Sequence, residues 1–140
     1  WLLSKTGAAV IRVEPSVLKA EDRWDGFGFL GTSDLQKCYG QRVRFTPKEI
    51  QLGADLWNAF RKNDHERLIE LSKAEQERFP YLAEVVEAAV ERDTRPAEIV
   101  AEIQFEGKTE FDDIFAEFKR RAGVYGYGNL QVQRIIEGIA

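Results

Sequence analysis

The segment closest in spelling to a ligand-binding motif is the glycine-rich run Gly26-Phe27-Gly28-Phe29-Leu30-Gly31. Its GxGxxG spacing is the one that places backbone N–H groups against the pyrophosphate of a dinucleotide, at the start of a helix. That fingerprint follows its β-strand directly, whereas the nearest predicted strand ends at Val13, about a dozen residues earlier. We therefore interpret the run as a connector and predict no bound cofactor.

Two further side chains could take part in catalysis. His65 lies between Asp64 and Glu66, whose carboxylates could hold or charge an imidazole that acts as a general base. Cys38 could be a nucleophile only if a base reached it, and its spacing pairs it with no histidine. A solvated histidine and a partly buried structural thiol are the simpler interpretations, so we predict no catalytic residue.

Composition argues against metal sites and disulfides. A single histidine and a single cysteine supply neither a His-rich zinc site nor an internal disulfide, so we predict no metal. Glutamates are abundant, but they fall on predicted helix faces opposite the apolar stripes, and nothing selects a catalytic pair among them. They are Glu66, Glu70, Glu77, Glu84, Glu87 and Glu91.

A set of basic and amide side chains near the C-terminus could contact nucleic acid. Three of them could meet phosphates, and three on the last predicted helix could address base edges. They are Lys119, Arg120 and Arg121, then Gln131, Gln133 and Arg134. Residues 95–140 nevertheless carry six basic and eight acidic side chains, a net charge of −2, and counterion-driven binding needs a basic surface.

The whole chain is also mildly acidic. Its 140 residues include 20 Lys and Arg against 24 Asp and Glu, a net charge of −4, which excludes a bulk binder of polyanions. With 44% hydrophobic residues the chain can bury a core, and no apolar run approaches the roughly 18 residues that predict a membrane span. The sparse cysteine favours a reducing compartment, so we expect a cytoplasmic protein with no membrane partner.

The periodicity of the chain is mostly helical. Residues 8–13 form a β-branched run closed by Pro15, which predicts one strand, whose sheet partners we expect in an upstream region or a second copy. Residues 16–45 read as a connector with at most a short helix near Ser33–Cys38. About six helices follow, with predicted starts at Thr46-Pro47-Lys48-Glu49, Asp64, Pro80, Pro96, Thr109 with Asp112, and Asn129.

These elements predict a mainly α fold: a helical bundle plus a tri-helical, winged-helix-like C-terminal unit, with one short N-terminal strand left from an upstream α/β region and no independent sheet. The predicted divisions are residues 1–45 for the end of that region and the connector, 46–93 for a helical region and 94–140 for the tri-helical unit. The predicted core comprises Val10, Ile11, Trp57, Phe60, Leu68, Leu82, Val85, Ile99, Ile103, Phe115, Phe118, Ile135 and Ile136.

The order of several short motifs resembles the downstream half of a bacterial family. The strand at residues 10–13, the segments 26–31, 44–50, 56–61 and 79–82, and the closing segments 111–115 and 126–131 have the order seen in the domain-of-unknown-function 1835 proteins. The resemblance covers nearly the whole chain. It implies an upstream α/β region with polar motifs rich in His and Asp, and it implies no activity.

Two function hypotheses follow. The first is a non-catalytic helical interaction or regulatory module of a larger cytoplasmic bacterial protein, since the chain begins at Trp1 and contains no methionine. Its expected partner is the missing N-terminal domain or a second copy, held through residues 1–30, with Ile11→Lys weakening the contact. The alternative is a winged-helix-type, transcription-related domain that binds nucleic acid.

Overall fold

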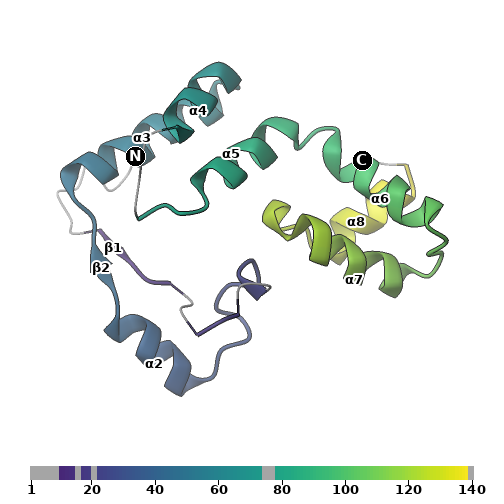
Figure 1. Ribbon diagram of the computed structural model, residues 1–140, viewed down its shortest axis with the longest axis horizontal. Helices are drawn as coiled ribbons and strands as arrows, with labels where there is room; N and C mark the ends of the chain where they lie inside the picture. The colour runs from purple at the N-terminus through teal and green to yellow at the C-terminus, as the bar shows by residue number, and fades with distance from the viewer. Residues whose placement is uncertain (1–9, 15–16, 20–21, 74–77, 139–140) are drawn as a thin grey trace. The chain divides into compact units, whose positions relative to one another are not determined.

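The described residues of the first part of the chain contain a two-stranded sheet and three α-helices. The computed structural model describes residues 10–14, 17–19, 22–73 and 78–138 and divides the chain into two units, Trp1–Glu77 and Arg78–Ala140. In the first unit the elements are β1 (Ile11–Arg12), α2 (Thr32–Gly40), β2 (Val43–Arg44), α3 (Pro47–Arg61) and α4 (His65–Ser72), as Figure 1 shows.

The predicted strand pairs within the chain, and the expectation of no independent sheet is wrong. β1 and β2 are antiparallel, with Ile11 opposite Arg44 and Arg12 opposite Val43, and the N–H of Phe45 donates to the carbonyl of Val10 at 2.9 Å. Two-residue strands carry too few side chains for an alternating pattern to be visible in the sequence. β2 therefore supplies the hydrogen-bond partner for one edge of β1, and that edge needs neither an upstream sheet nor a second copy of the chain.

Local capping starts α3 and α4 where the sequence predicts. The Thr46 hydroxyl accepts from the Glu49 backbone N–H at 3.3 Å while the Glu49 carboxylate accepts from the Thr46 backbone N–H at 2.6 Å, which completes a capping box with Pro47 at the first helical position. Asp64 accepts from the Arg67 backbone N–H at 3.0 Å and caps α4. Both predicted helix starts, at Thr46 and at Asp64, are confirmed. Each cap involves only four consecutive residues, so the residue types alone suffice to predict it.

Trp57 is not a core residue. Its side chain is 47% exposed and stacks on Phe60 with ring centroids 6.0 Å apart. The buried residues of α3 include Leu52 and Ala59, which lie about 150° around the helix from Trp57 at 3.6 residues per turn. Trp57 therefore lies away from the part of the buried face of α3 that carries Leu52 and Ala59.

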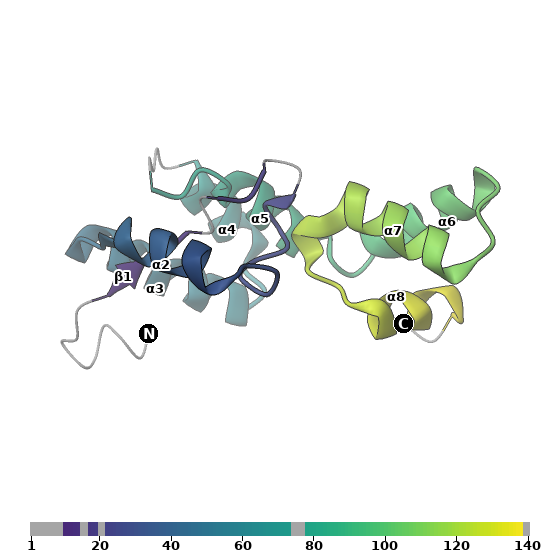
Figure 2. The same cartoon turned by 90° about the horizontal axis from the view of Figure 1, so that it is seen from below.

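In the described part of the second unit, residues 78–138, all the regular elements are helices. It contains α5 (Leu82–Glu91), α6 (Arg95–Phe105), α7 (Phe111–Ala122), the short 3-10 helix η2 (Gly123–Tyr125) and α8 (Asn129–Ile136). The helices α6, α7 and α8 contact one another pairwise and lie side by side in Figures 1 and 2. The three helices are those predicted, but these residues contain no strand that could form a wing.

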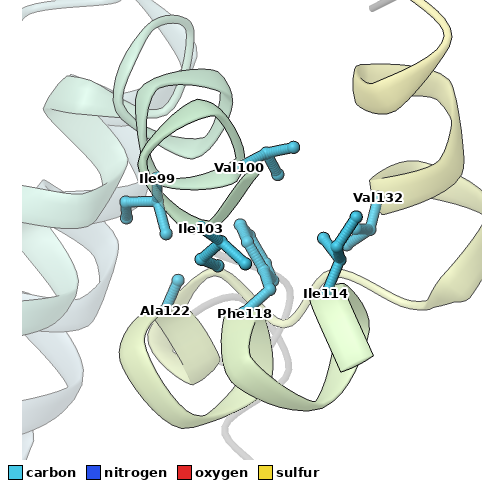
Figure 3. Packing of buried hydrophobic residues seen from close by; sticks show 7 residues of the cluster. All are labelled: Ile99, Val100, Ile103, Ile114, Phe118, Ala122 and Val132. Atoms are coloured by element: carbon cyan, nitrogen blue, oxygen red, sulfur yellow. The ribbon is translucent and has the colours of Figure 1, made fainter. Parts of the chain in front are cut away.

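The core of this unit is one apolar cluster contributed by α6, α7 and α8. In Figure 3 the side chains of Ile103 and Phe118 point toward each other between α6 and α7, and both are fully buried, at 0% and 1% exposure. Val132, also 0% exposed, is the buried residue of α8. The buried members are Ile99, Val100, Ile103, Ile114, Phe118, Ala122 and Val132. Each is apolar, so the three helices are held together by hydrophobic burial.

Two predicted caps are wrong by one residue. The residue that caps α7 is Glu110, so Thr109 and Asp112 make no capping box, and the residue that caps α8 is Gly128 in place of Asn129. The Asn129 side chain instead accepts from the Leu130 backbone N–H at 2.9 Å. Short polar side chains compete for several neighbouring backbone groups. The sequence therefore predicts where each turn lies, but it does not predict which residue caps the helix that follows.

The predicted core is confirmed at some positions and wrong at others. Leu68, Ile99, Ile103 and Phe118 are buried. A further group is partly buried: Val10, Phe60, Leu82, Phe115, Ile135 and Ile136. Three predicted core residues are exposed, namely Ile11 at 43%, Trp57 at 47% and Val85 at 42%. Two of these errors, at Ile11 and Val85, lie on elements that contact segments far away in sequence, since β1 pairs with β2 and α5 contacts η2.

Two long-range contacts lie within the two compact units of the chain. β2 pairs with β1 in the unit that ends at residue 77, and α5 contacts η2 in the unit that follows it, while the predicted divisions at 45 and 93 stay predictions. The described residues contain seven α-helices, and the one beyond the predicted six is α2, which extends the short helix expected near Ser33–Cys38. The helix at Pro80 begins two residues later, at Leu82.

Candidate functional site

A pocket lies between the start of α6 and α8 in the C-terminal unit. We call it the α6–α8 pocket. It has a volume of about 560 Å³, within the range of ligand sites. Its lining residues are Arg92, Asp93, Pro96, Ala97, Tyr127, Gln131, Arg134 and Ile135. Most of the polar ones are exposed, so the pocket opens to solvent.

The backbone of α6 offers the pocket few hydrogen-bond donors. Pro96 has no N–H, and the N–H groups of Ala97 and Glu98 both donate to the carbonyl of Thr94, at 3.1 and 3.2 Å. At positions 96–98 of this helix start, the amides that usually bind an anion are therefore already occupied or missing. Recognition in this pocket falls to side chains.

A turn of glycines and tyrosines positions the opposite wall. Gly126 has φ +64°, a left-handed conformation that side chains other than glycine rarely adopt, and it lets the chain reverse after η2. Tyr127 then stacks on the core residue Phe118 with centroids 6.1 Å apart, and its hydroxyl donates to the carbonyl of Arg92 at 3.4 Å. This ring is thereby tied to both the core and the link between α5 and α6.

Gln131 is held in a defined orientation. Its Oε1 accepts from the Gly128 backbone N–H at 2.9 Å, and a Cβ at residue 128 would come within 3.2 Å of that oxygen. With the oxygen engaged, the side-chain amide nitrogen is the group left to contact a ligand, and it has no partner among the described residues. Gln131 therefore presents hydrogen-bond donors.

The charges of the pocket are unequal. Arg92 pairs with Asp93 over 3.4 Å from Nε to Oδ1, whereas no carboxylate lies within 4.0 Å of Arg134 in the described part of the chain. Gln131 and Arg134 are three residues apart on α8 and so share one face. The pocket thus combines one internally paired arginine with one exposed arginine that is open to a ligand.

Of the residues proposed for nucleic-acid contact, only Gln131 and Arg134 meet in this pocket. Gln133 donates to Glu137 at 2.9 Å, and the run from Lys119 to Arg121 lies in the last turn of α7, outside the lining. The sequence did not indicate the other lining residues, because Arg92, Pro96 and Tyr127 come together only through the packing of α6 and α8.

Two of the three basic side chains at the end of α7, those of Arg120 and Arg121, form ion pairs with carboxylates. Arg120 donates to Glu117 at 3.0 Å from Nε and 2.5 Å from a terminal nitrogen, and Arg121 donates to Glu117 at 2.5 Å and to Glu106. The hydrogen bonds from Arg120 and then Arg121 lower the pKa of Glu117 to about 2, and the hydrogen bond from Arg121 lowers the pKa of Glu106. These arginines therefore act within the protein, linking the segment after α6 to α7.

Acid should weaken the C-terminal unit through Glu117. Its pKa is about 2 when folded and near the ordinary 4.5 when unfolded, so between these values the unfolded state binds more protons. The stabilisation is fully present above about pH 4.5 and is lost as pH falls toward 2. Urea denaturation of Glu117→Gln at neutral and acidic pH should show a shallower acid dependence than the unsubstituted chain.

Glu110→Gln is the matched control for that measurement. Glu110 is exposed at the cap of α7, and no side-chain cap hydrogen bond forms there. Its variant should retain the acid dependence of the unsubstituted chain. If the two variants have the same acid dependence, Glu117 is not the group that couples protons to the stability of this unit.

The other chemical candidates lie apart from this pocket. His65 is exposed at the first position of α4. Cys38 is buried in α2 at 1% exposure, more completely than the partly buried thiol that the sequence predicts. Gly31 caps α2, so the GxGxxG run does precede a helix, but the strand before it is antiparallel and ends at Arg12. The described residues hold no cluster of three His, Cys, Asp or Glu side chains that could bind a metal.

No α-helix in the described ranges has the length and apolarity needed to span a bilayer.

Comparison with protein-family models, curated proteins and solved structures finds no match for this chain. The resemblance to the domain-of-unknown-function 1835 proteins therefore stays a prediction, and any functional proposal must come from the residues themselves.

Proposed function

We propose that this chain is a non-catalytic helical interaction or regulatory module of a larger cytoplasmic bacterial protein, and that the α6–α8 pocket is its binding site. The observation that carries the proposal is the make-up of the pocket: apolar surface from Pro96, Tyr127 and Ile135 beside the polar side chains of Gln131 and Arg134. Apolar walls with a few directed polar groups are typical of binding sites.

The lining also lacks the arrangement that catalysis requires. It contains no Ser, Cys, His or Lys, and its one carboxylate, Asp93, pairs with Arg92. A nucleophile needs a base within hydrogen-bond reach, and a general acid or base must lie within hydrogen-bond reach of the proton that it transfers. The residues of this pocket favour binding over turnover.

Nucleic-acid binding by a winged-helix-type domain is the competing proposal, and the charges weigh against it. The unit of residues 78–140 carries eight basic and twelve acidic side chains, a net charge of −4. Arg120 and Arg121 are engaged by Glu117 and Glu106. Phosphate backbones are attracted by clustered positive charge, which this unit does not concentrate.

A displayed peptide library tests the proposed function. We expect peptides selected on the full chain to bind it, and Ala97→Trp to reduce their binding at least about tenfold, a change of about 1.4 kcal/mol, by filling the pocket. Ala97 is exposed and lines the pocket. Binding can be measured by isothermal titration calorimetry.

Ala101→Trp provides the control, because Ala101 is exposed one turn further along α6 and does not line the pocket. This variant should bind the selected peptides as the unsubstituted chain does. Failure to select any peptide, or equal effects of the two tryptophans, would contradict the proposed function. A gel shift with duplex DNA at low salt that Arg134→Ala weakens would support the competing one.

A further inference from the structure

The free polar groups of the α6–α8 pocket are donors. Arg134 has an exposed guanidinium, and Gln131 has its amide nitrogen free because its oxygen is held by Gly128. Asp93, the only carboxylate of the lining, pairs with Arg92. A complementary ligand group must accept hydrogen bonds and carry negative charge, since a planar guanidinium fork matches a carboxylate or phosphate.

The surrounding charge selects between those two anions. Within the lining, Asp93 balances the charge of Arg92, which leaves the positive charge of Arg134 for a ligand, and the unit around the pocket has a net charge of −4. A carboxylate at −1 matches that one positive charge, whereas the second charge of a phosphate near −2 is unmatched and is repelled by the surrounding field. The observations favour a single carboxylate.

The apolar lining determines what the carboxylate is attached to. Pro96 is buried, and Tyr127 and Ile135 are half-buried, so together they offer an apolar wall beside the two donors. The other lining residues are exposed, and such an open pocket would leave much of a small free ligand in water. A chain that continues beyond the pocket can add contacts outside it.

We infer that the α6–α8 pocket binds the carboxyl terminus of a peptide that ends in an apolar residue. The terminal carboxylate accepts from Arg134 and from the amide nitrogen of Gln131, and the last side chain packs on Pro96, Tyr127 and Ile135. Capture of a terminal carboxylate is a recurring mode of peptide recognition. This inference rests on the proposed function and specifies the ligand of the same site.

Titration of the full chain with two tripeptides tests the inference. The probes are acetyl-Ala-Ala-Leu with a free carboxylate and the same peptide with an amidated end, which differ by one charge. We expect the free acid to bind at least about tenfold more tightly and to shift the NMR signals of the Arg134 Nε–H and the Gln131 side-chain amide. Arg134→Gln should abolish the difference between the two peptides.

Lys119→Gln controls for long-range charge, because it removes one positive charge from an exposed position of α7 outside the pocket. It should leave the preference for the free acid intact. If selected library peptides bind in the pocket but amidation does not weaken them, the carboxylate inference is overturned while the proposed function stands. If no peptide binds, the proposed function fails as well.

A third probe separates the two sources of a carboxylate. N-acetyl-leucine carries the same terminal residue without the rest of the chain, so it should bind more weakly than the tripeptide acid. Equal affinity of the two would show that the pocket recognises a small free carboxylate. That result would overturn the assignment to a peptide end.

Discussion

Replacing Phe118 by alanine is expected to lower the free energy of unfolding of the C-terminal unit by about 3–5 kcal/mol. The Phe118 ring is 1% exposed and lies among the apolar side chains of α6, α7 and α8 (Figure 3). Its removal loses buried apolar area and leaves a cavity that the flanking helices fill only in part. Urea denaturation followed by the amide signals of α6 and α7 measures the loss.

Phe105→Ala is the matched control, because it removes the same side chain from a position of α6 that is 95% exposed. We expect a change within about 0.5 kcal/mol, as for most surface substitutions. Since Phe118 stacks on Tyr127, the Phe118 variant should also weaken peptide binding in the α6–α8 pocket. Similar losses in stability for the two variants would mean that the cluster is not the core of the unit.

Replacing Val132 by aspartate should destabilise the same unit by at least about 3 kcal/mol at neutral pH. Val132 is 0% exposed, and every buried member of the cluster around it is apolar, so a carboxylate there would have no partner. Burial raises the pKa of such a carboxyl group above its unfolded value. The destabilisation should therefore be largest above the folded pKa and decrease as pH falls below it.

Leu130→Asp separates buried charge from charge on α8 in general. Leu130 is 66% exposed and lies in the first turn of the helix, where a negative charge is favoured by the helix dipole. Its variant should differ little from the unsubstituted chain in denaturation at either pH. A loss for Val132→Asp that is equally small, or independent of pH, would show that α8 is not packed on α6 and α7.

The helix starts illustrate what short-range chemistry settles. The Thr46–Glu49 capping box and the Asp64 cap each involve backbone and side-chain groups within four residues, so their residue types alone predict the structure. The end of α6 is similar, since Gly107 takes φ +96°, a conformation that glycine adopts at low cost. The stripe of α6 is also correct, with Ile99 and Ile103 buried.

The candidate site shows what helix caps, glycine turns and helical period cannot predict. The sequence singled out Gln131 and Arg134, which share a helix face by spacing alone, but only as nucleic-acid contacts of the alternative hypothesis, together with Gln133 and the basic end of α7. Whether a side chain is available to a ligand depends on partners that are distant in sequence. Arg121 donates to Glu106, fifteen residues away, and the Tyr127 hydroxyl donates to the carbonyl of Arg92, thirty-five residues away.

By itself, the sequence determined a mainly helical chain, most helix positions and two capped starts, because helical period, caps and glycine turns are properties of neighbouring residues. Only the tertiary structure decided that β1 pairs with β2, that Trp57 faces solvent, and that α6 and α8 line an open pocket. The strand pairing and the pocket depend on contacts between segments far apart in the chain. Many side chains are apolar enough to be buried, and only the packing of whole helices selects which of them are.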